Sequence, residues 1–221
     1  MKILAIDTSS EICGVCILED NKLIDDNSLN NGMTHSENLM PLISEILERN
    51  NLKLSDIELI ACTVGPGSFT GIRIGVATIK ALAEVNNIKL AEITSLEVLA
   101  GNIENAEYKV SIIDARNDQV YCGVFDKENN LIEDMIADSI NNTIQKLKKY
   151  NNIVCVGNGA IKHKELLKSQ IPDIEFCEEN IQKAEIAGKI GYTKFLNNDL
   201  KSADDILPIY LRKSQAERMK K

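Results

Sequence analysis

The apolar positions of the first half of the chain alternate or form short blocks before they adopt a helical spacing. Short blocks predict strands, and apolar positions that recur every three to four residues predict helices. The predicted strands are Lys2–Asp7, Ile12–Leu18, Lys22–Asn27, Ile57–Val64 and Leu90–Thr94, and the predicted helices are Glu37–Arg49 and Ile72–Val85. Thr34 and Glu37 have the spacing of a capping box. Because Pro41 removes a backbone donor, we expect the first helix to start late or to bend there.

The second half of the chain repeats this order of patterns. Val110–Arg116 is similar to Ile3–Ser9, Cys122–Val124 is similar to Cys13–Val15, and Leu131–Asp134 is similar to Leu23–Asp26. Next come a helix-like run at Ile140–Lys149, a strand at Ile153–Val156, the turn Gly157-Asn158-Gly159 and a helix-like run at Ala184–Leu196. An Asp that ends the first strand of a hairpin-then-helix unit occurs twice. This repetition predicts an α/β protein with a duplicated ribonuclease-H-like (actin-like or sugar-kinase-like) fold, in which two subdomains have mixed sheets.

The polar segment Gly101–Glu107 is the predicted linker between the subdomains. We therefore expect an N-terminal subdomain over residues 1–104, which holds a glycine loop and two candidate partner-binding helices. We expect a C-terminal subdomain over residues 105–221, which ends in a basic tail.

The glycine loop, Val64–Gly75, joins a predicted strand to a predicted helix. It lacks the lysine of a Walker A loop, and its third glycine comes one position too late for the dinucleotide fingerprint. Glycine at such a junction lets the backbone turn sharply or approach a phosphate or another backbone. Three interpretations stay open: a phosphate cradle, a protein-contact surface and a tight turn.

Charge and composition narrow the function classes. The net charge of -8 argues against a stand-alone nucleic-acid binder. Residues 211–221 are locally basic, which fits either a solvated tail or a helper contact to RNA. The chain opens without a signal-peptide pattern and has no apolar stretch of the ~18 residues that a membrane helix needs, so we expect a cytoplasmic protein that does not contact the membrane.

The six cysteines are scattered along the chain. Cys13 and Cys16 form a C-x-x-C spacing, but they lie in a predicted strand, where side chains three positions apart point to opposite faces. Two such thiols cannot chelate one zinc ion. We interpret the cysteines as small buried hydrophobic residues.

Five motifs together resemble one known family. They are Ile6-Asp7-Thr8-Ser9, His35-Ser36-Glu37-x-Leu39-x-Pro41, the Gly65–Gly75 loop, Asp114-Ala115-Arg116 with Val120-Tyr121, and Pro208-x-Tyr210-Leu211-Arg212. In this combination the chain resembles the bacterial TsaB (YeaZ) family from Ile6 to Arg212. The first half carries the more specific part of the resemblance.

This resemblance implies a function in tRNA modification. TsaB proteins bind and activate a catalytic paralogue, TsaD, which transfers a threonylcarbamoyl group to the adenosine beside the anticodon, and the ATPase TsaE completes the complex. The resemblance implies a non-catalytic subunit that forms homodimers in isolation and heterodimers with TsaD, and that reaches tRNA indirectly through the complex. It further implies that the isolated chain binds no cofactor, and that ATP or ADP with Mg²⁺ is bound at an interface of the complex.

The catalytic paralogue carries an H-x-E-x-H metal motif after the glycine loop and its helix. Here Ser95 and Leu99 stand at the two histidine positions, and only Glu97 remains. Serine is a poor ligand for iron or zinc, and leucine is none. The two histidines, His35 and His163, are far apart in sequence. We therefore predict neither a catalytic residue nor a metal site.

Asp7, Thr8, Gly65 and Gly67 are the candidate nucleotide-binding residues. In related phosphotransferases an aspartate at the end of the first strand holds Mg²⁺ near the nucleotide phosphates, and Asp114 would complete a two-aspartate cleft. A small-molecule ATP-dependent phosphotransferase is thus the alternative function. In the competing interpretation, the Asp7 carboxylate caps a turn by accepting nearby N–H groups.

Two predicted helices offer a candidate partner interface. Small residues recur at Gly71, Gly75 and Thr78, and the preceding helix offers apolar side chains at Leu39, Ile43 and Ile46. Glycine inside a helix costs roughly 1 kcal/mol relative to alanine, so a close approach by another backbone should offset it. That backbone belongs either to a partner or to the chain's own core. The interface interpretation predicts that a bulky residue at Gly75 weakens association more than folding.

His35, Ser36 and Glu37 also allow a hydrolase interpretation. A peptidase needs a nucleophile paired with a base, and the chain has no G-x-S-x-G elbow. We favour a role for this motif in capping and positioning the helix that follows.

Overall fold

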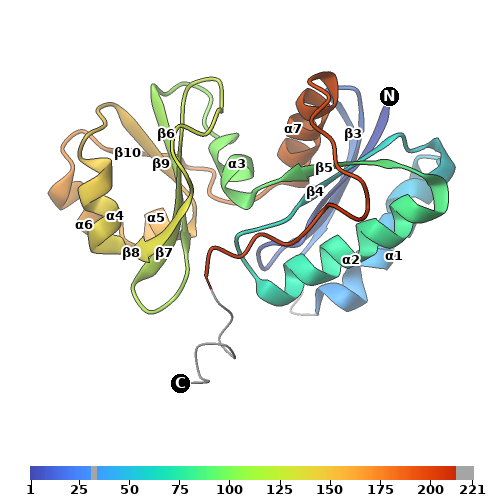
Figure 1. Cartoon of the computed structure of the whole chain (residues 1–221), viewed down its shortest axis with the longest axis horizontal. Helices are drawn as coiled ribbons and strands as arrows, with labels where there is room; N and C mark the ends of the chain where they lie inside the picture. Colours follow the sequence, from blue (N-terminus) through green and yellow to red (C-terminus); the bar gives the residue numbers. More distant parts are fainter. Residues whose placement is uncertain (31–33, 213–221) are drawn as a thin grey trace. The chain divides into compact units, whose positions relative to one another are not determined.

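The computed structural model describes residues 1–30 and 34–212. The chain divides into two compact units, each with its own sheet (Figure 1). The first unit holds residues 1–98 and 182–209, and the second holds residues 99–181 and the C-terminal segment from residue 210. Residues 213–221 of the predicted basic tail lie outside the described residues.

The first unit is built on a five-stranded mixed sheet. Its strands are β1 (Lys2–Asp7), β2 (Cys13–Glu19), β3 (Lys22–Leu29), β4 (Leu59–Thr63) and β5 (Lys89–Ile93), in the order β3-β2-β1-β4-β5. β1, β2 and β3 form an antiparallel meander, and β4 and β5 add in parallel beside β1. The parallel pairing brings the ends of β1 and β4, and the loops that follow them, to one edge of the sheet.

Helices cover both faces of this sheet (Figure 1). α1 (His35–Arg49) and α2 (Phe69–Asn86) pack on one face, and α7 (Ala184–Leu196) packs on the other. Neighbouring strand residues alternate between the two cores: Leu4 and Ile6 face α1 and α2, whereas Ile3 and Ala5 face α7. Short elements complete the unit, namely η1 (Leu54–Asp56) and the start of α3 (Ser95–Ala100).

The second unit repeats this sheet in reduced form. Its strands are β6 (Tyr108–Asp114), β7 (Gln119–Phe125), β8 (Ile136–Ser139), β9 (Ile153–Val156) and β10 (Glu175–Phe176), in the order β10-β9-β6-β7-β8. Its helices are α4 (Ile140–Leu147), α5 (Asn158–Lys162) and α6 (Lys164–Gln170). A core that includes Val110, Ile144 and Leu167 lies beneath the helices. Again three antiparallel strands precede two parallel ones, so the duplicated α/β fold is confirmed.

The predicted domain boundary needs a correction. Residues 182–209 belong to the first unit, although the sequence pattern assigned everything after residue 104 to the second. The physical reason is the packing of α7, whose glycines let it lie close to the first sheet. A Cβ built on Gly191 would come within 2.6 Å of the Ala61 Cβ, and one on Gly188 would come within 2.2 Å of a Leu18 methyl group.

Two local details differ from the predictions. The third strand of the second unit is β8, whereas Leu131–Asp134 forms only an isolated bridge at Leu131. α1 begins at His35, two residues before the predicted Glu37, and includes Pro41, so the late start is wrong and the bend at Pro41 stays a prediction. None of the helices within residues 1–30 and 34–212 is both long enough and apolar enough to cross a lipid bilayer.

Candidate functional site

The turn after β1 buries a carboxylate. The Asp7 Oδ1 atom accepts hydrogen bonds from the backbone N–H and the hydroxyl of Ser9, both at 2.8 Å. Asp7 is only 2% exposed, and its Oδ2 atom has no hydrogen-bond partner among the described residues. Burial raises the pKa of the Asp7 carboxyl, and the hydrogen bonds from Ser9 oppose this shift. Asp7 therefore caps its own turn, and one oxygen remains unsatisfied.

The glycine loop packs directly on this turn. The Ser68 N–H donates to the Ser9 carbonyl at 2.8 Å, and the Thr8 hydroxyl donates to the Gly71 carbonyl at 2.8 Å. A Cβ on Gly67 would lie 2.2 Å from the Ser9 carbonyl oxygen, and one on Gly71 would lie 2.1 Å from that of Thr8. These glycines are thus required because the chain's own backbone approaches them.

Gly65 and Gly75 complete the same packing. Gly65 has a left-handed φ of +112°, and a Cβ there would meet the Ile209 carbonyl oxygen at 2.7 Å. A Cβ on Gly75 would lie 2.3 Å from the Thr8 Oγ1 atom. A bulky residue at Gly75 is therefore expected to destabilise the fold itself. This corrects the expectation that such a change would act mainly on association.

His35 and Glu37 position the start of α1. The Glu37 carboxylate accepts from the Thr34 backbone N–H at 3.0 Å. The His35 Nε2 atom lies 2.8 Å from the Ser10 carbonyl oxygen, which can only accept, so Nε2 carries the proton. This hydrogen bond ties the His35 ring to the loop that follows β1, and the geometry therefore favours the capping and positioning interpretation over the peptidase interpretation.

Glu97, the residue that remains at the position of the metal motif, caps α3. Its Oε2 atom accepts from the Thr94 N–H at 2.6 Å, and its own N–H donates to the Thr94 hydroxyl oxygen at 3.1 Å. Its carboxylate also lies 3.2 Å from the Lys194 ammonium group. Ser95 and Leu99 are buried beside it. Within the part of the chain that the structure describes, no three His, Cys, Asp or Glu side chains gather in a way that could hold a metal ion.

Most of the predicted partner-interface residues lie inside the first unit. Leu39, Ile43 and Ile46 are at most 2% exposed and belong to its core, and Gly71 and Gly75 are buried against the β1 turn. The assignment of these five residues to a partner-facing surface is therefore wrong for this conformation, because the sheet of the same chain covers them.

The opposite sides of α1 and α2 are open to solvent. On α2, Ala77, Ala81 and Val85 recur every four residues and are exposed, and half-buried Thr78 lies beside them. Val85 is 79% exposed, and Met40 on α1 is 49% exposed. We call these five residues the outer face. Sequence reasoning missed Ala77, Ala81 and Val85, although their own four-residue spacing, shifted from that of the core positions, was a usable signal.

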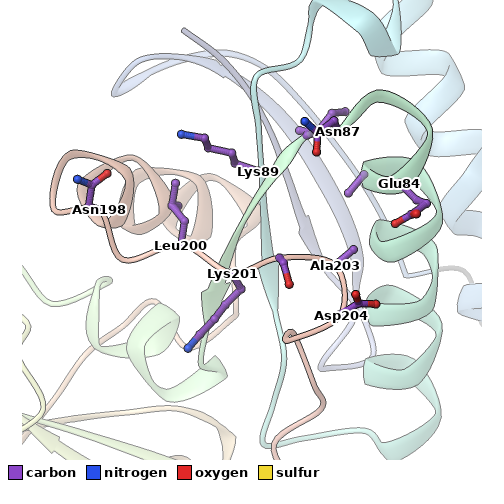
Figure 2. A pocket seen from close by; sticks show the side chains of 11 residues that line it. Glu84, Asn87, Lys89, Asn198, Leu200, Lys201, Ala203 and Asp204 are labelled. Carbon is purple, nitrogen blue, oxygen red and sulfur yellow. The ribbon is translucent and has the colours of Figure 1, made fainter.

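A pocket of about 490 Å³ opens at the far end of α2 from the glycine loop. It lies between the last turn of α2 and the segment that follows α7 (Figure 2). Lys89, Lys201, Glu84 and Asp204 are among the residues that line it. Since α2 has 18 residues, about 27 Å of helix separates this pocket from the β1 turn.

The second unit places Asp114 at the position equivalent to Asp7. Its carboxylate lies 3.0 Å from the Lys162 ammonium group and accepts from the Arg116 N–H at 3.1 Å. The Asp114 side chain is 23% exposed and forms an ion pair, whereas Asp7 is buried. The two-aspartate cleft stays a prediction.

Comparison with known proteins gives consistent results. A family profile described as TsaD, tRNA N6-adenosine threonylcarbamoyltransferase, matches residues 31–219. The tRNA threonylcarbamoyladenosine biosynthesis protein TsaB of Bacillus subtilis is 31% identical over 98% of this chain and 96% of that protein. The protein of the same name from Escherichia coli is 28% identical over 98% of this chain and 96% of its own length.

Solved structures agree on the fold. YeaZ from Pseudomonas aeruginosa has a TM-score of 0.80 at 23% identity and covers 95% of this chain and 99% of its own. An activator of 2-hydroxyisocaproyl-CoA dehydratase from Clostridium difficile, solved with bound ADPNP, has a TM-score of 0.56 at 10% identity, over 95% of this chain and 100% of its own. The near full-length match to the Bacillus subtilis relative, together with the family profile, shows that this chain belongs to the TsaB (YeaZ) family.

Proposed function

We propose that this protein is a non-catalytic subunit in tRNA threonylcarbamoyladenosine biosynthesis, and that it binds and activates its catalytic paralogue TsaD in the cytoplasm. The relatives named for this biosynthesis support the pathway. The observation that carries the partner role is the outer face of α1 and α2. There Met40, Ala77, Ala81 and Val85 expose apolar surface on helices whose other sides are fixed to the core.

The state of Glu97 supports a role without catalysis. Its carboxylate is engaged by Thr94 and Lys194, while serine and leucine occupy the positions of the paralogue's histidines. The outer face suits a helix from a second molecule, because alanines at four-residue spacing allow close helix packing. We propose that it pairs with TsaD in the active complex and with a second copy of this chain in the homodimer. TsaE joins through the complex, and tRNA is reached through TsaD.

One observation favours the alternative, an ATP-dependent phosphotransferase. The Asp7 Oδ2 atom is buried without a hydrogen-bond partner among the described residues, as a carboxylate awaiting a hydrated Mg²⁺ would be. Against it, the carbonyl oxygens of Ser9 and Thr8 already lie against Gly67 and Gly71, so the chain's own backbone explains these glycines without a phosphate. We therefore propose that the isolated chain binds no nucleotide, and that any ATP or ADP with Mg²⁺ is held only in the complex.

Reconstitution tests the proposal. Threonylcarbamoylation of a tRNA transcript is measured with TsaD, TsaE and the carbamoyl donor, with and without this chain. We expect modification to require the chain and to fall at least about tenfold with Ala81→Arg, because an arginine placed in an apolar helix interface loses its hydration without gaining a partner. The melting temperature should not change, since Ala81 is exposed.

Leu196→Arg is the matched control, because Leu196 is 63% exposed on α7, away from the outer face. It should leave modification and TsaD binding unchanged. Modification that proceeds equally well without the chain would refute the proposal. Mg-ATP turnover by the isolated chain that is lost in Asp7→Asn would establish the alternative.

A further inference from the structure

The pocket at the C-terminal end of α2 is formed entirely by the first unit. Its lining residues come from two segments, residues 83–89 and residues 198–204, and both segments belong to that unit. Leu90 and Lys201 exchange two backbone hydrogen bonds, of 2.8 Å and 3.4 Å, which tie the second segment to the edge strand β5. The walls of the pocket are therefore held in place by the fold, as is usual for a small-molecule site.

Part of the lining is apolar. Ala83 and Ile88 are only 2% and 8% exposed, and Leu200 and Ala203 are half-buried. All four side chains also pack on the hydrophobic cores of the first unit. The volume of about 490 Å³ is within the range of ligand pockets. The pocket therefore has room for a small molecule and an aliphatic surface against which methylene groups can be buried.

The acidic side chains lie at the α2 end of the pocket. Figure 2 shows Glu84 on the last turn of α2 and Asp204 beside this helix, where the Lys80 ammonium group donates to the Asp204 backbone carbonyl at 3.5 Å. Neither carboxylate forms an ion pair or hydrogen bond within residues 1–30 and 34–212. The last turn of α2 holds no basic residue, although the C-terminus of a helix favours a positive charge. This end of the pocket therefore suits the ammonium group of a ligand.

The basic side chains extend in the other direction. In Figure 2, Lys89 and Lys201 extend from the edge of the sheet away from α2. The Lys89 ammonium group lies over the Phe195 ring of α7, 5.7 Å from its centroid. The Lys201 ammonium group has no hydrogen bond or ion pair in the part of the chain that the structure describes. Negative and positive groups are thus separated across one pocket, which suits a ligand with two opposite charges.

We propose that this pocket binds a small zwitterion in which an aliphatic chain joins an ammonium group to a carboxylate, as in lysine between its side-chain ammonium group and its carboxylate. The ammonium group binds at Glu84 and Asp204, and the carboxylate binds at Lys201. The aliphatic chain covers Ile88 and Leu200. Charge-assisted hydrogen bonds at the two ends and burial of the methylene groups between them provide the affinity. The site does not depend on the proposed function.

Three compounds with the same aliphatic chain test the proposal. They are 6-aminohexanoate, hexylamine and hexanoate, which carry both charges, only the ammonium group and only the carboxylate. Titration of the isotopically labelled full-length chain, followed by amide NMR spectra, gives the affinity for each compound. We expect 6-aminohexanoate to bind at least about tenfold more tightly than either singly charged compound, because only it forms charge-assisted hydrogen bonds at both ends. Equal affinities for the three compounds would overturn the proposal.

Substitutions at the two ends should have opposite selectivity. Glu84→Gln should weaken binding of 6-aminohexanoate and hexylamine about tenfold and leave hexanoate unchanged, whereas Lys201→Gln should weaken 6-aminohexanoate and hexanoate and leave hexylamine unchanged. Glu128→Gln is the matched control, because it removes an exposed carboxylate from the second unit, and it should bind all three compounds like the wild type. Since all three substituted residues are exposed, their melting temperatures should not change.

The amide spectra also locate the site. Binding of 6-aminohexanoate should shift the amide signals of Asn87, Lys89 and Ser202, which line the pocket, and should leave those of the β1 turn in place. Shifts that exclude the pocket residues would overturn the proposal, and so would unchanged affinity in both Glu84→Gln and Lys201→Gln. A lack of saturable binding of 6-aminohexanoate up to about 10 mM would also overturn it, because this limit is weaker than the affinity of a specific site.

Discussion

The two units share the turn that follows their first strand, but its aspartate has a different environment in each unit. In both, glycines after the fourth strand pack a helix against the end of the first strand. A Cβ on Gly71 would lie 2.1 Å from the Thr8 carbonyl oxygen, and one on Gly157 would lie 2.4 Å from that of Ile112. The aspartates differ, because Asp7 is buried with one oxygen that has no hydrogen-bond partner in residues 1–30 and 34–212, whereas Asp114 forms an ion pair with Lys162 near the surface. The shared packing belongs to the fold, and the chemistry of each turn varies independently.

The helices after these turns differ as well. α2 runs for 18 residues and leaves an apolar outer face, while its counterparts α5 and α6 have 5 and 7 residues. The first unit therefore exposes a long helical surface, whereas the helices after the second turn are short. Each unit has kept the scaffold, and the length of the helix that follows the glycine turn differs between them.

The largest effect should come from removing a shared glycine. Gly71→Ala is expected to destabilise the protein by about 3 kcal/mol, because its Cβ would meet the backbone of Thr8 at 2.1 Å and the ring of His35 at 2.7 Å. Gly159→Ala in the second unit should cost about 1 kcal/mol, since its closest contacts lie at 2.9 Å. Thermal and urea melts followed by circular dichroism measure both.

Thr70→Ala, at the exposed neighbour of Gly71, serves as the control and should stay within about 0.5 kcal/mol of wild type. If Gly71→Ala melts like this control, the glycine loop does not need the close approach, and the parallel between the two turns would lose its physical basis.

The buried carboxylate should appear in the pH dependence of stability. Burial raises the pKa of Asp7 in the folded state. The contribution of Asp7 to the free energy of unfolding is therefore most favourable below the usual pKa near 4, and this stability is lost as the pH rises through the raised pKa. Asp7→Asn cannot ionise and does not lose stability in this way. Its free energy of unfolding relative to wild type should therefore rise between about pH 4 and pH 7, by about 1 to 3 kcal/mol.

Asp25 provides the control of opposite sign. The Arg49 guanidinium group lowers the pKa of Asp25, so this pair stabilises the fold above the unfolded pKa and is lost as the pH falls. Asp25→Asn should thus destabilise the protein at pH 7, by about 0.5 kcal/mol because the pair is partly exposed, and the difference should vanish in acid. If the free energies of unfolding of the two variants, each relative to wild type, changed with pH in the same direction, Asp7 would not be in a desolvated environment.

Local pattern predicted much of the fold. The predicted bounds are confirmed for two strands and one helix, namely Lys2–Asp7, Ile153–Val156 and Ala184–Leu196. In each, an apolar run between polar residues determines both the type and the length of the element. The repeated Asp and glycine turns predicted the duplication for the same local reason. The placement of α7 in the first unit could not be predicted this way, since it depends on Gly188 and Gly191 meeting strands more than a hundred residues away.

The candidate partner surface shows a second limit. Apolar periodicity at Leu39, Ile43 and Ile46 identifies one side of a helix, but a core and an interface use the same residue types. Only the position of the sheet decides between them. The left-handed φ of +63° at Arg116, in the hairpin between β6 and β7, was likewise not predictable, because it follows from the hairpin geometry rather than from the residue type.

The smallest expected effect compares the serine caps of the two units. Ser68 and Ser139 each accept a backbone N–H at 3.2 Å, from Gly71 and Asn142 respectively. Ser68→Ala should cost about 1 kcal/mol, because the Gly71 N–H is packed against the β1 turn and water cannot easily replace the serine. Ser139→Ala should cost about 0.5 kcal/mol, since the Asn142 N–H is exposed and can bind water.

Urea denaturation gives the two energies, and amide hydrogen exchange at Gly71 and Asn142 locates them. Exchange at Gly71 should accelerate in Ser68→Ala while the rest of α2 stays protected, because the Ser68 N–H remains bound to the Ser9 carbonyl. Ser139→Ala should let the first turn of α4 fray, since a helix of 8 residues has little else to hold it. A larger loss of stability in Ser139→Ala than in Ser68→Ala would contradict this prediction. It would mean that the serine cap contributes more to stability in the second unit than in the first.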